Sequence, residues 1–197
     1  MYTDVSGCSV YYGSVDWNIM KTQKIKALKY IVHPEYVTGA NDIALIELNE
    51  TLKFSEFVQP LNETLKFSEF VQPVCLDHNV DPLDDEILTH CGMGSDFKKR
   101  LTEGFSHDSH NILQDAPIQH INPSICGSDE KRKICAGGVN HVALPGDSGG
   151  PLMVIRREQW IQIGVLSGFG WHGFENESLS IHAIGMKFNL ITNRNRF

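Results

Sequence analysis

The sequence predicts an all-β protein whose strands form barrels or a sandwich. Helical periodicity is scarce along the 197 residues, and short apolar runs separated by turn residues dominate instead. The turns recur at regular intervals, which is typical of barrels and sandwiches.

The individual strands are predicted from runs of apolar and β-branched residues. In chain order we expect strands at residues 10–12, 25–32, 43–48, 161–166 and 180–184. Residues 186–192 are expected to begin a short C-terminal helix.

The composition limits the classes of partner. Hydrophobic residues make up 41% and charged residues 21%, which is ordinary for a soluble globular protein. Lys plus Arg number 17 against 24 for Asp plus Glu, a net charge of −7 that argues against nucleic acid and anionic membranes as partners. No apolar run is long enough to span a membrane. The first residues lack the features of a signal peptide, so secretion would need upstream sequence.

A duplication interrupts the first half of the chain. Residues 48–60 and 61–73 have the same sequence, LNETLKFSEFVQP. Solenoid repeats are longer, diverged and more numerous. We interpret the pair as a recent tandem duplication or an error in assembling the coding sequence. The second copy is expected to bulge out, because surface loops accept insertions at low cost.

Five cysteines leave at least one thiol without a partner inside the chain. None forms a Cys-x-x-Cys pair, which disfavours zinc and redox sites. Cys126 and Cys135 enclose a short polar loop that suits a local disulfide. The pairing of Cys8, Cys75 and Cys91 stays open.

The strongest functional signal is the hexapeptide Gly146-Asp147-Ser148-Gly149-Gly150-Pro151. Its glycines allow a tight turn and a close approach of the backbone to a substrate. The amides of Gly146 and Ser148 could then converge on one point and stabilise a tetrahedral oxyanion. The alternative is a glycine-rich turn with an ordinary serine, and the rest of the chain favours the nucleophile.

This hexapeptide resembles the nucleophile motif of the trypsin/chymotrypsin family of serine endopeptidases. The resemblance runs from about residue 10 to about residue 192. The segment Asn41-Asp42-Ile43-Ala44-Leu45-Ile46 resembles the one that carries the triad aspartate, which falls on Asp42. Gly92-Met93-Gly94 resembles the turn that opens the second barrel, with Met for Trp. The link between barrels, the strand before the nucleophile and the strand beside substrate are matched at residues 73–76, 134–137 and 164–167.

The resemblance implies two antiparallel six-stranded β-barrels, the first of them truncated, and a short C-terminal helix. Residues 1–74 would form the partial N-terminal barrel with the duplicated segment, and residues 75–197 the C-terminal barrel with the nucleophile. Ser148 would form the acyl-enzyme while Asp42 orients a histidine. In the family the aspartate at Asp147 pairs with the amino group made by zymogen cleavage and shapes the oxyanion hole. No metal or organic cofactor is implied.

No segment of the sequence resembles the one that carries the family's triad histidine. The family carries it in Ala-Ala-His-Cys, and neither this motif nor the activation sequence Ile-Val-Gly-Gly occurs. We therefore expect an N-terminally incomplete copy of an active protease, or else a degenerate, non-catalytic pseudoprotease that binds proteins. His33 and His141 are the histidines closest in sequence to Asp42 and Ser148, and both are expected in loops. The others are expected to be exposed: His78, His90, His107, His110, His120, His172 and His182.

The primary specificity pocket is implied at Val142, six residues before the nucleophile, and at the wall Ser167-Gly168-Phe169. Valine cannot pair with Lys or Arg, so an apolar or aromatic substrate side chain is expected. Ser167 would also support Asp42, and Cys126 with Cys135 fits a disulfide of the family. The implied partners are a protein or peptide substrate and macromolecular protease inhibitors, and the protein is expected to be a secreted monomer.

Overall fold

The computed structural model describes residues 7–22, 24–37, 41–50, 74–77, 80–95, 110–122, 133–138, 143–173 and 179–187. Contacts divide the chain into two units. Unit 1 comprises Met1–Tyr36, Ile43–Pro73 and Asn111–Leu113. Unit 2 comprises Val37–Asp42, Val74–His110 and Gln114–Phe197. Most of the duplicated segment, residues 51–73, lies outside the described residues.

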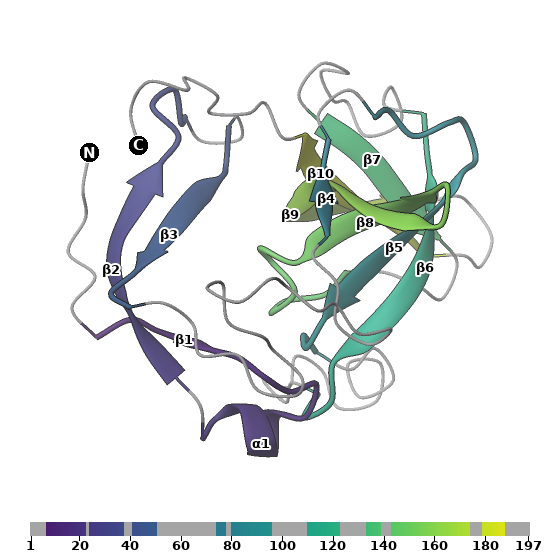
Figure 1. The fold of residues 1–197 in the computed structure, drawn as a ribbon. Coiled ribbons are helices and arrows are strands. Elements are labelled where there is room, and N and C mark those ends of the chain that lie inside the picture. Colours follow the sequence, from purple (N-terminus) through teal and green to yellow (C-terminus); the bar gives the residue numbers. More distant parts are fainter. Residues whose placement is uncertain are drawn as a thin grey trace. The chain divides into compact units, whose positions relative to one another are not determined.

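Unit 1 contains a three-stranded antiparallel sheet in the order β1-β2-β3 (Figure 1). Its strands are β1 (Ser9–Tyr11), β2 (Lys24–Val32) and β3 (Ala44–Leu48). In the first half of β2, Ile25 and Ala27 are buried while Lys24 and Lys26 are exposed, the two-residue alternation of a half-buried strand. The described residues of unit 1 thus form three strands, against the six expected for a complete barrel.

A short helix, α1 (Trp17–Met20), follows β1 and was not expected from the sequence. It begins where the Asp16 side chain accepts a hydrogen bond from the Asn18 amide at 2.8 Å, a local N-cap that needs no long-range pattern. The rings of Tyr11 and Trp17 form an edge-to-face contact, with centroids 5.0 Å apart. No helix among the described residues is long and apolar enough to cross a membrane.

Unit 2 is a β-barrel. Its strands are β4 (Cys75–Leu76), β5 (Ile87–Gly92), β6 (Gln114–His120), β7 (Lys133–Gly138), β8 (Pro151–Arg156), β9 (Gln159–Gly173) and β10 (Leu179–Lys187). The order is β10-β7-β6-β5-β8-β9-β4, and β10 also pairs with β9, so six antiparallel strands form a closed ring (Figure 1). The all-β prediction is therefore confirmed.

The end of β10 corrects one prediction. Met186, expected in a terminal helix, pairs with Lys133 on β7 and with Val165 on β9. Ladder hydrogen bonds to two neighbouring strands outweigh the weak local preference for helix. Residues 188–192, the rest of the expected helix, lie outside the described residues.

The barrel core consists of apolar side chains that point inward from β5 to β9. Its buried members are Leu88, Ile118, Ile134, Ala136, Leu152, Val154, Ile161 and Ile163. Two histidines expected to be exposed are buried as well, with His90 only 5% and His120 only 8% exposed. The expectation was wrong because both continue the alternation of their strands, two residues after a core side chain.

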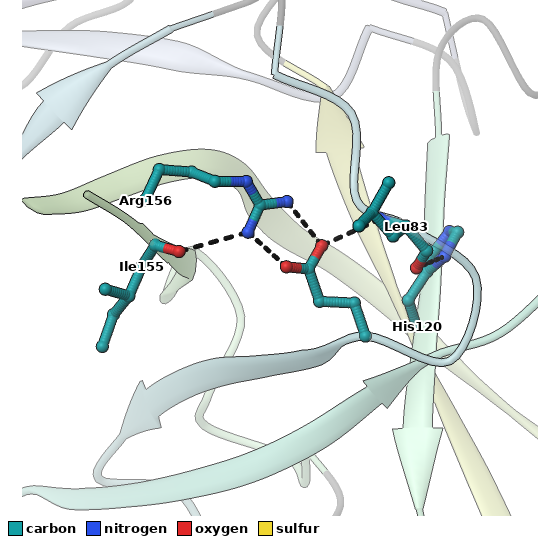
Figure 2. A network of polar contacts seen from close by, with 5 residues as sticks. Leu83, His120, Ile155 and Arg156 are labelled. Atoms are coloured by element: carbon teal, nitrogen blue, oxygen red, sulfur yellow. Dashed lines mark hydrogen bonds and ion pairs between the residues drawn. The ribbon is translucent and has the colours of Figure 1, made fainter. Parts of the chain in front are cut away.

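A polar network surrounds Glu86, and Figure 2 labels Leu83, His120, Ile155 and Arg156 among its members. Arg156, at the end of β8, donates from Nη2 to Glu86 Oε2 at 2.6 Å and from Nη1 to Oε1. Glu86 Oε2 also accepts from the Leu83 amide at 2.8 Å, and His120 Nδ1 lies 2.8 Å from the Leu83 carbonyl oxygen. The network therefore joins the segment before β5 to both β6 and β8.

Replacing Arg156 with glutamine should lower the free energy of unfolding by about 1–2 kcal/mol at neutral pH, because Glu86 loses charge-assisted hydrogen bonds. These hydrogen bonds hold the pKa of Glu86 below its ordinary 4.5. The stabilisation is thus present above pH 4.5 and is lost as the pH falls through the lowered pKa. Urea unfolding of both proteins should show a difference that shrinks from neutral pH towards pH ~3.

Arg157→Gln is the matched control, because it removes the same charge from the exposed neighbouring residue. It should change stability by no more than about 0.5 kcal/mol. A difference between wild type and Arg156→Gln that stays constant with pH would contradict the role assigned to Glu86.

Candidate active site

The predicted nucleophile lies in a loop between β7 and β8, and residues 143–150 are called the nucleophile loop below. Three of its backbone amides donate hydrogen bonds to carbonyl oxygens. Asp147 donates to the Leu144 carbonyl at 3.0 Å, Gly149 to Leu166 at 2.9 Å and Gly150 to Asp147 at 2.9 Å. The amides of Gly146 and Ser148 make no hydrogen bond to any described residue. Two donors thus remain available on either side of Asp147.

The backbone of the loop depends on glycine at two positions. Gly146 has φ +102° and Gly149 has φ +87°, in a region that residues with a Cβ rarely adopt. These glycines flank Asp147 and Ser148, and Ser148 is exposed. The turn therefore presents the Ser148 hydroxyl at the surface rather than in the core.

The side chain of Asp147 is held by backbone amides. Oδ1 accepts from the Gly94 amide at 2.7 Å, and Oδ2 accepts from the Leu144 amide at 2.9 Å. A Cβ added at Gly92 would lie 2.0 Å from Oδ1, and one added at Gly94 would lie 2.5 Å from it. The Gly92-Met93-Gly94 turn is therefore the glycine cradle of this carboxylate. The pairing of Asp147 with a new amino terminus stays a prediction.

The predicted triad aspartate reaches the same region of unit 2 through β9. Asp42 Oδ2 accepts a hydrogen bond from the Ser167 hydroxyl at 2.8 Å. The residue before Ser167, Leu166, exchanges hydrogen bonds with the nucleophile loop: its carbonyl accepts from the Gly149 amide and its amide donates to Gly150, both at 2.9 Å. Two consecutive residues of β9 thus bind Asp42 and the loop that carries Ser148.

The specificity pocket is only partly described. Gly168 and Phe169 lie in β9, next to Ser167, whereas Val142 lies outside the described residues. A Cβ at Gly168 would meet nothing within 4 Å.

The histidines considered as possible bases do not lie in the nucleophile loop. His33 belongs to unit 1, and its Nδ1 accepts a hydrogen bond from the Glu35 amide at 3.2 Å. Other predicted positions outside the described residues are Cys126, His78, His107 and His141.

The described cysteines and potential metal ligands are not gathered into a cluster. No group of three His, Cys, Asp or Glu side chains among the described residues could hold a metal ion. Cys8, Cys75 and Cys91 carry free thiols, and burial raises the pKa of the Cys91 thiol. Cys135 is fully buried in β7 and is not among the free cysteines.

Sequence reasoning missed His90, which lies directly beneath the nucleophile loop. Its Nδ1 lies 3.1 Å from the carbonyl oxygen of Pro151, the residue that ends the hexapeptide. A Cβ at Gly150 would lie 2.7 Å from His90 Cε1. The two-residue spacing from buried Leu88 is the signal that could have revealed this burial.

Unit 2 thus combines an all-β barrel with an exposed serine, a loop held by the Asp147 carboxylate and an aspartate bonded to Ser167 on β9. The sequence profile of the trypsin family matches residues 8–182, so the chain belongs to the trypsin family.

Several curated proteases are similar to this chain. CLIP domain-containing serine protease B15 of Anopheles gambiae is 30% identical over 146 residues, which cover 70% of this chain and 36% of that protein. Mannan-binding lectin serine protease 1 of Mus musculus is 28% identical over 151 residues, 74% of this chain and 20% of that protein. Venom serine protease Bi-VSP of Bombus ignitus is 29% identical over 160 residues, 70% and 37% of the two chains. The chain thus spans well under half the length of these relatives.

Replacing Gly92 with alanine should displace the Asp147 carboxylate, since the new methyl group would overlap Oδ1. Overpacking of this kind typically costs about 1–3 kcal/mol. Thermal unfolding should therefore show a clear loss of stability, and the Gly94 amide proton should lose its downfield NMR position as its carboxylate acceptor moves. Gly168→Ala is the control, because a methyl group there enters open space. Equal effects of the two substitutions would refute the cradle.

Proposed function

We propose that this protein is a secreted serine endopeptidase that works through an acyl-enzyme. The observation that carries the proposal is the pattern of amides in the nucleophile loop. The amides of Gly146 and Ser148 are left without acceptors among the described residues, while those of Asp147, Gly149 and Gly150 are bonded. Two unbonded amides close to an exposed serine, one of them its own, are what an oxyanion hole requires.

The proposed chemistry assigns one role to each residue. Ser148 Oγ attacks the scissile carbonyl carbon, and its proton passes to a histidine imidazole. The carbonyl oxygen becomes an oxyanion held by the amides of Gly146 and Ser148. The imidazole then gives the proton to the leaving amine, and water hydrolyses the acyl-enzyme by the reverse route. Asp42, fixed by Ser167, orients the imidazole and stabilises its charged form.

The histidine of this scheme would come from sequence upstream of the match, which begins at residue 8. We propose two domains, at residues 1–74 and 75–197, of which the second carries Ser148. The relatives named as serine proteases support protein substrates, and the venom protease among them supports secretion. Val142 favours an apolar or aromatic side chain in the pocket. Macromolecular inhibitors and a monomeric state complete the proposal, with no nucleic acid, membrane or cofactor.

We also propose a disulfide between Cys126 and Cys135. Its support is the burial of Cys135 and the fact that Cys135 is not one of the free cysteines among the described residues. Closing so short a loop should stabilise the fold by about 2–3 kcal/mol on the chain-entropy estimate. Peptide mapping of unreduced protein should recover the two cysteines in one cross-linked pair, and Cys126→Ser should lower the urea midpoint. A mapped bond from Cys135 to any other cysteine would overturn the pairing.

Catalysis is tested by labelling the natively secreted, full-length protein with a fluorophosphonate probe, which reacts only with an activated serine. We expect one labelled site, Ser148, and no labelling of Ser148→Ala. Asp42→Asn should slow the labelling greatly, because loss of the aspartate costs about 10⁴-fold in other serine protease triads. Ser167→Ala should slow it less, since it removes only one support of Asp42.

The same experiment decides the alternative function. Folded, secreted protein that leaves Ser148 unlabelled would contradict the endopeptidase and favour a pseudoprotease that binds proteins through the retained cleft. Sequencing the region 5′ to the coding sequence gives an independent check. A reading frame that encodes Ile-Val-Gly-Gly and Ala-Ala-His-Cys upstream supports the enzyme.

A further inference from the structure

The buried histidine beneath the nucleophile loop has no part in the proposed chemistry, yet it contacts the base of that loop. His90 lies on β5 and is 5% exposed. Gly150 and Pro151 lie against its ring, as the 2.7 Å approach of a Gly150 Cβ to Cε1 and the Nδ1 contact with the Pro151 carbonyl show. The ring therefore supports the two residues that follow Ser148-Gly149.

The hydrogen bond to Pro151 fixes the tautomer of His90. A carbonyl oxygen can only accept, so Nδ1 must carry the proton that is donated at 3.1 Å. In the neutral ring, Nε2 is then an unprotonated acceptor. This atom is buried and has no hydrogen-bond partner among the described residues.

Protonation would change this site sharply, because it places an N–H donor and a positive charge at Nε2. A buried cation needs an acceptor or an anion. Asp147 is the anion beside this site, because its Oδ1 lies against Gly92, two residues from His90 on β5. Both oxygens of that carboxylate already accept the amides of Gly94 and Leu144. A charged His90 would therefore either stay unpaired or compete for the carboxylate that shapes the loop.

We propose that His90 is a positioning residue for the nucleophile loop, and that the loop keeps its observed conformation only while this imidazole is neutral. The effect of His90 on catalysis rests on the proposed role of Ser148, whereas the coupling of the His90 ring to the loop does not. Protonation of His90 would draw Asp147 from the Gly94 and Leu144 amides and disturb the oxyanion donors beside it. The nucleophile loop would thus lose its observed conformation at acidic pH.

Among the described residues around His90, no second charge could replace Asp147 in this role. On β5 the neighbouring titratable group is Cys91, whose thiol is kept neutral because burial raises its pKa. On β6 the residue opposite His90 is Ala116, and Asp115 lies opposite Cys91. On β8 the partners of β5 are Leu152 and Met153, both uncharged.

Burial lowers the pKa of His90 below its ordinary 6.5, against a smaller opposing effect of Asp147 and of the Pro151 carbonyl. A histidine with a lowered pKa binds its proton more weakly in the folded state than in the unfolded state. Its contribution to stability is therefore present above pH 6.5 and is lost as the pH falls through the lowered pKa.

The test compares the full 197-residue chain with His90→Asn at several pH values. Asparagine places its amide N–H near the position of Nδ1, so it can keep the bond to Pro151 and cannot titrate. Amide hydrogen exchange of Gly94, Leu144 and Gly150 is measured for both proteins at the same pH. Wild type should lose about tenfold in protection at these amides below the pKa of His90, beyond the intrinsic effect of pH, and His90→Asn should not.

His33→Asn is the matched control in unit 1 and should show the same acid step as wild type. NMR of wild type labelled with ¹³C at histidine Cε1 gives a second measurement, which holds even if His90→Asn does not fold. The His90 signal and the Gly94 amide signal should titrate together with a midpoint below pH 6.5. Parallel acid loss in wild type and His90→Asn, separate midpoints, or a midpoint at or above 6.5 would each overturn the proposal.

None of these measurements needs turnover, so their outcome is independent of the probe experiment on Ser148. Loss of amide protection at low pH without probe labelling would support the coupling and contradict only the endopeptidase. Probe labelling without the loss of amide protection at low pH would contradict only the coupling.

Discussion

The contact of the Asp147 carboxylate with the backbone of Gly94 and Leu144 is the interaction on which the nucleophile loop depends. Hydrogen bonds from amides to a carboxylate are about twice as strong as those between neutral groups. They fix Asp147 inside the loop, so its amide and carbonyl bond within the loop as well. The neighbouring amides of Gly146 and Ser148 are then the ones left over for an oxyanion. One side chain thus links the packing of the barrel to the proposed chemistry.

The barrel makes this contact possible by its strand order. β5 ends at Gly92 and β8 begins at Pro151, and these strands are antiparallel neighbours. The turn after β5 therefore meets the loop that precedes β8. On the other side of β8, β9 bonds to the loop through Leu166 and to Asp42 through Ser167. Rigid strands thus position a functional loop from two sides, as is common when function resides in loops.

The sequence was sufficient where the pattern is local. The hexapeptide located Ser148, and apolar runs located β1, β2, β3, β9 and β10 but not the strands between them. The two buried histidines could have been predicted from their spacing to Leu88 and Ile118. Contacts between distant segments could not be predicted, because nothing near Asp147 specifies a partner 53 residues away at Gly94. Only the predicted start of the terminal helix, Met186, was wrong, and for the same reason, since pairing with two other strands decided its conformation.

The interactions that shape the loop lie within unit 2, and so does Asp42 with its bond to Ser167. The loop geometry therefore does not depend on the segment that carries the family's histidine. An enzyme and a non-catalytic binding protein would share this loop, this cradle and this aspartate. What separates them is a single imidazole able to take a proton from Ser148, because serine is a weak nucleophile until a base does so. Retained loop geometry is thus a result of barrel packing, and activity is a further property that one base decides.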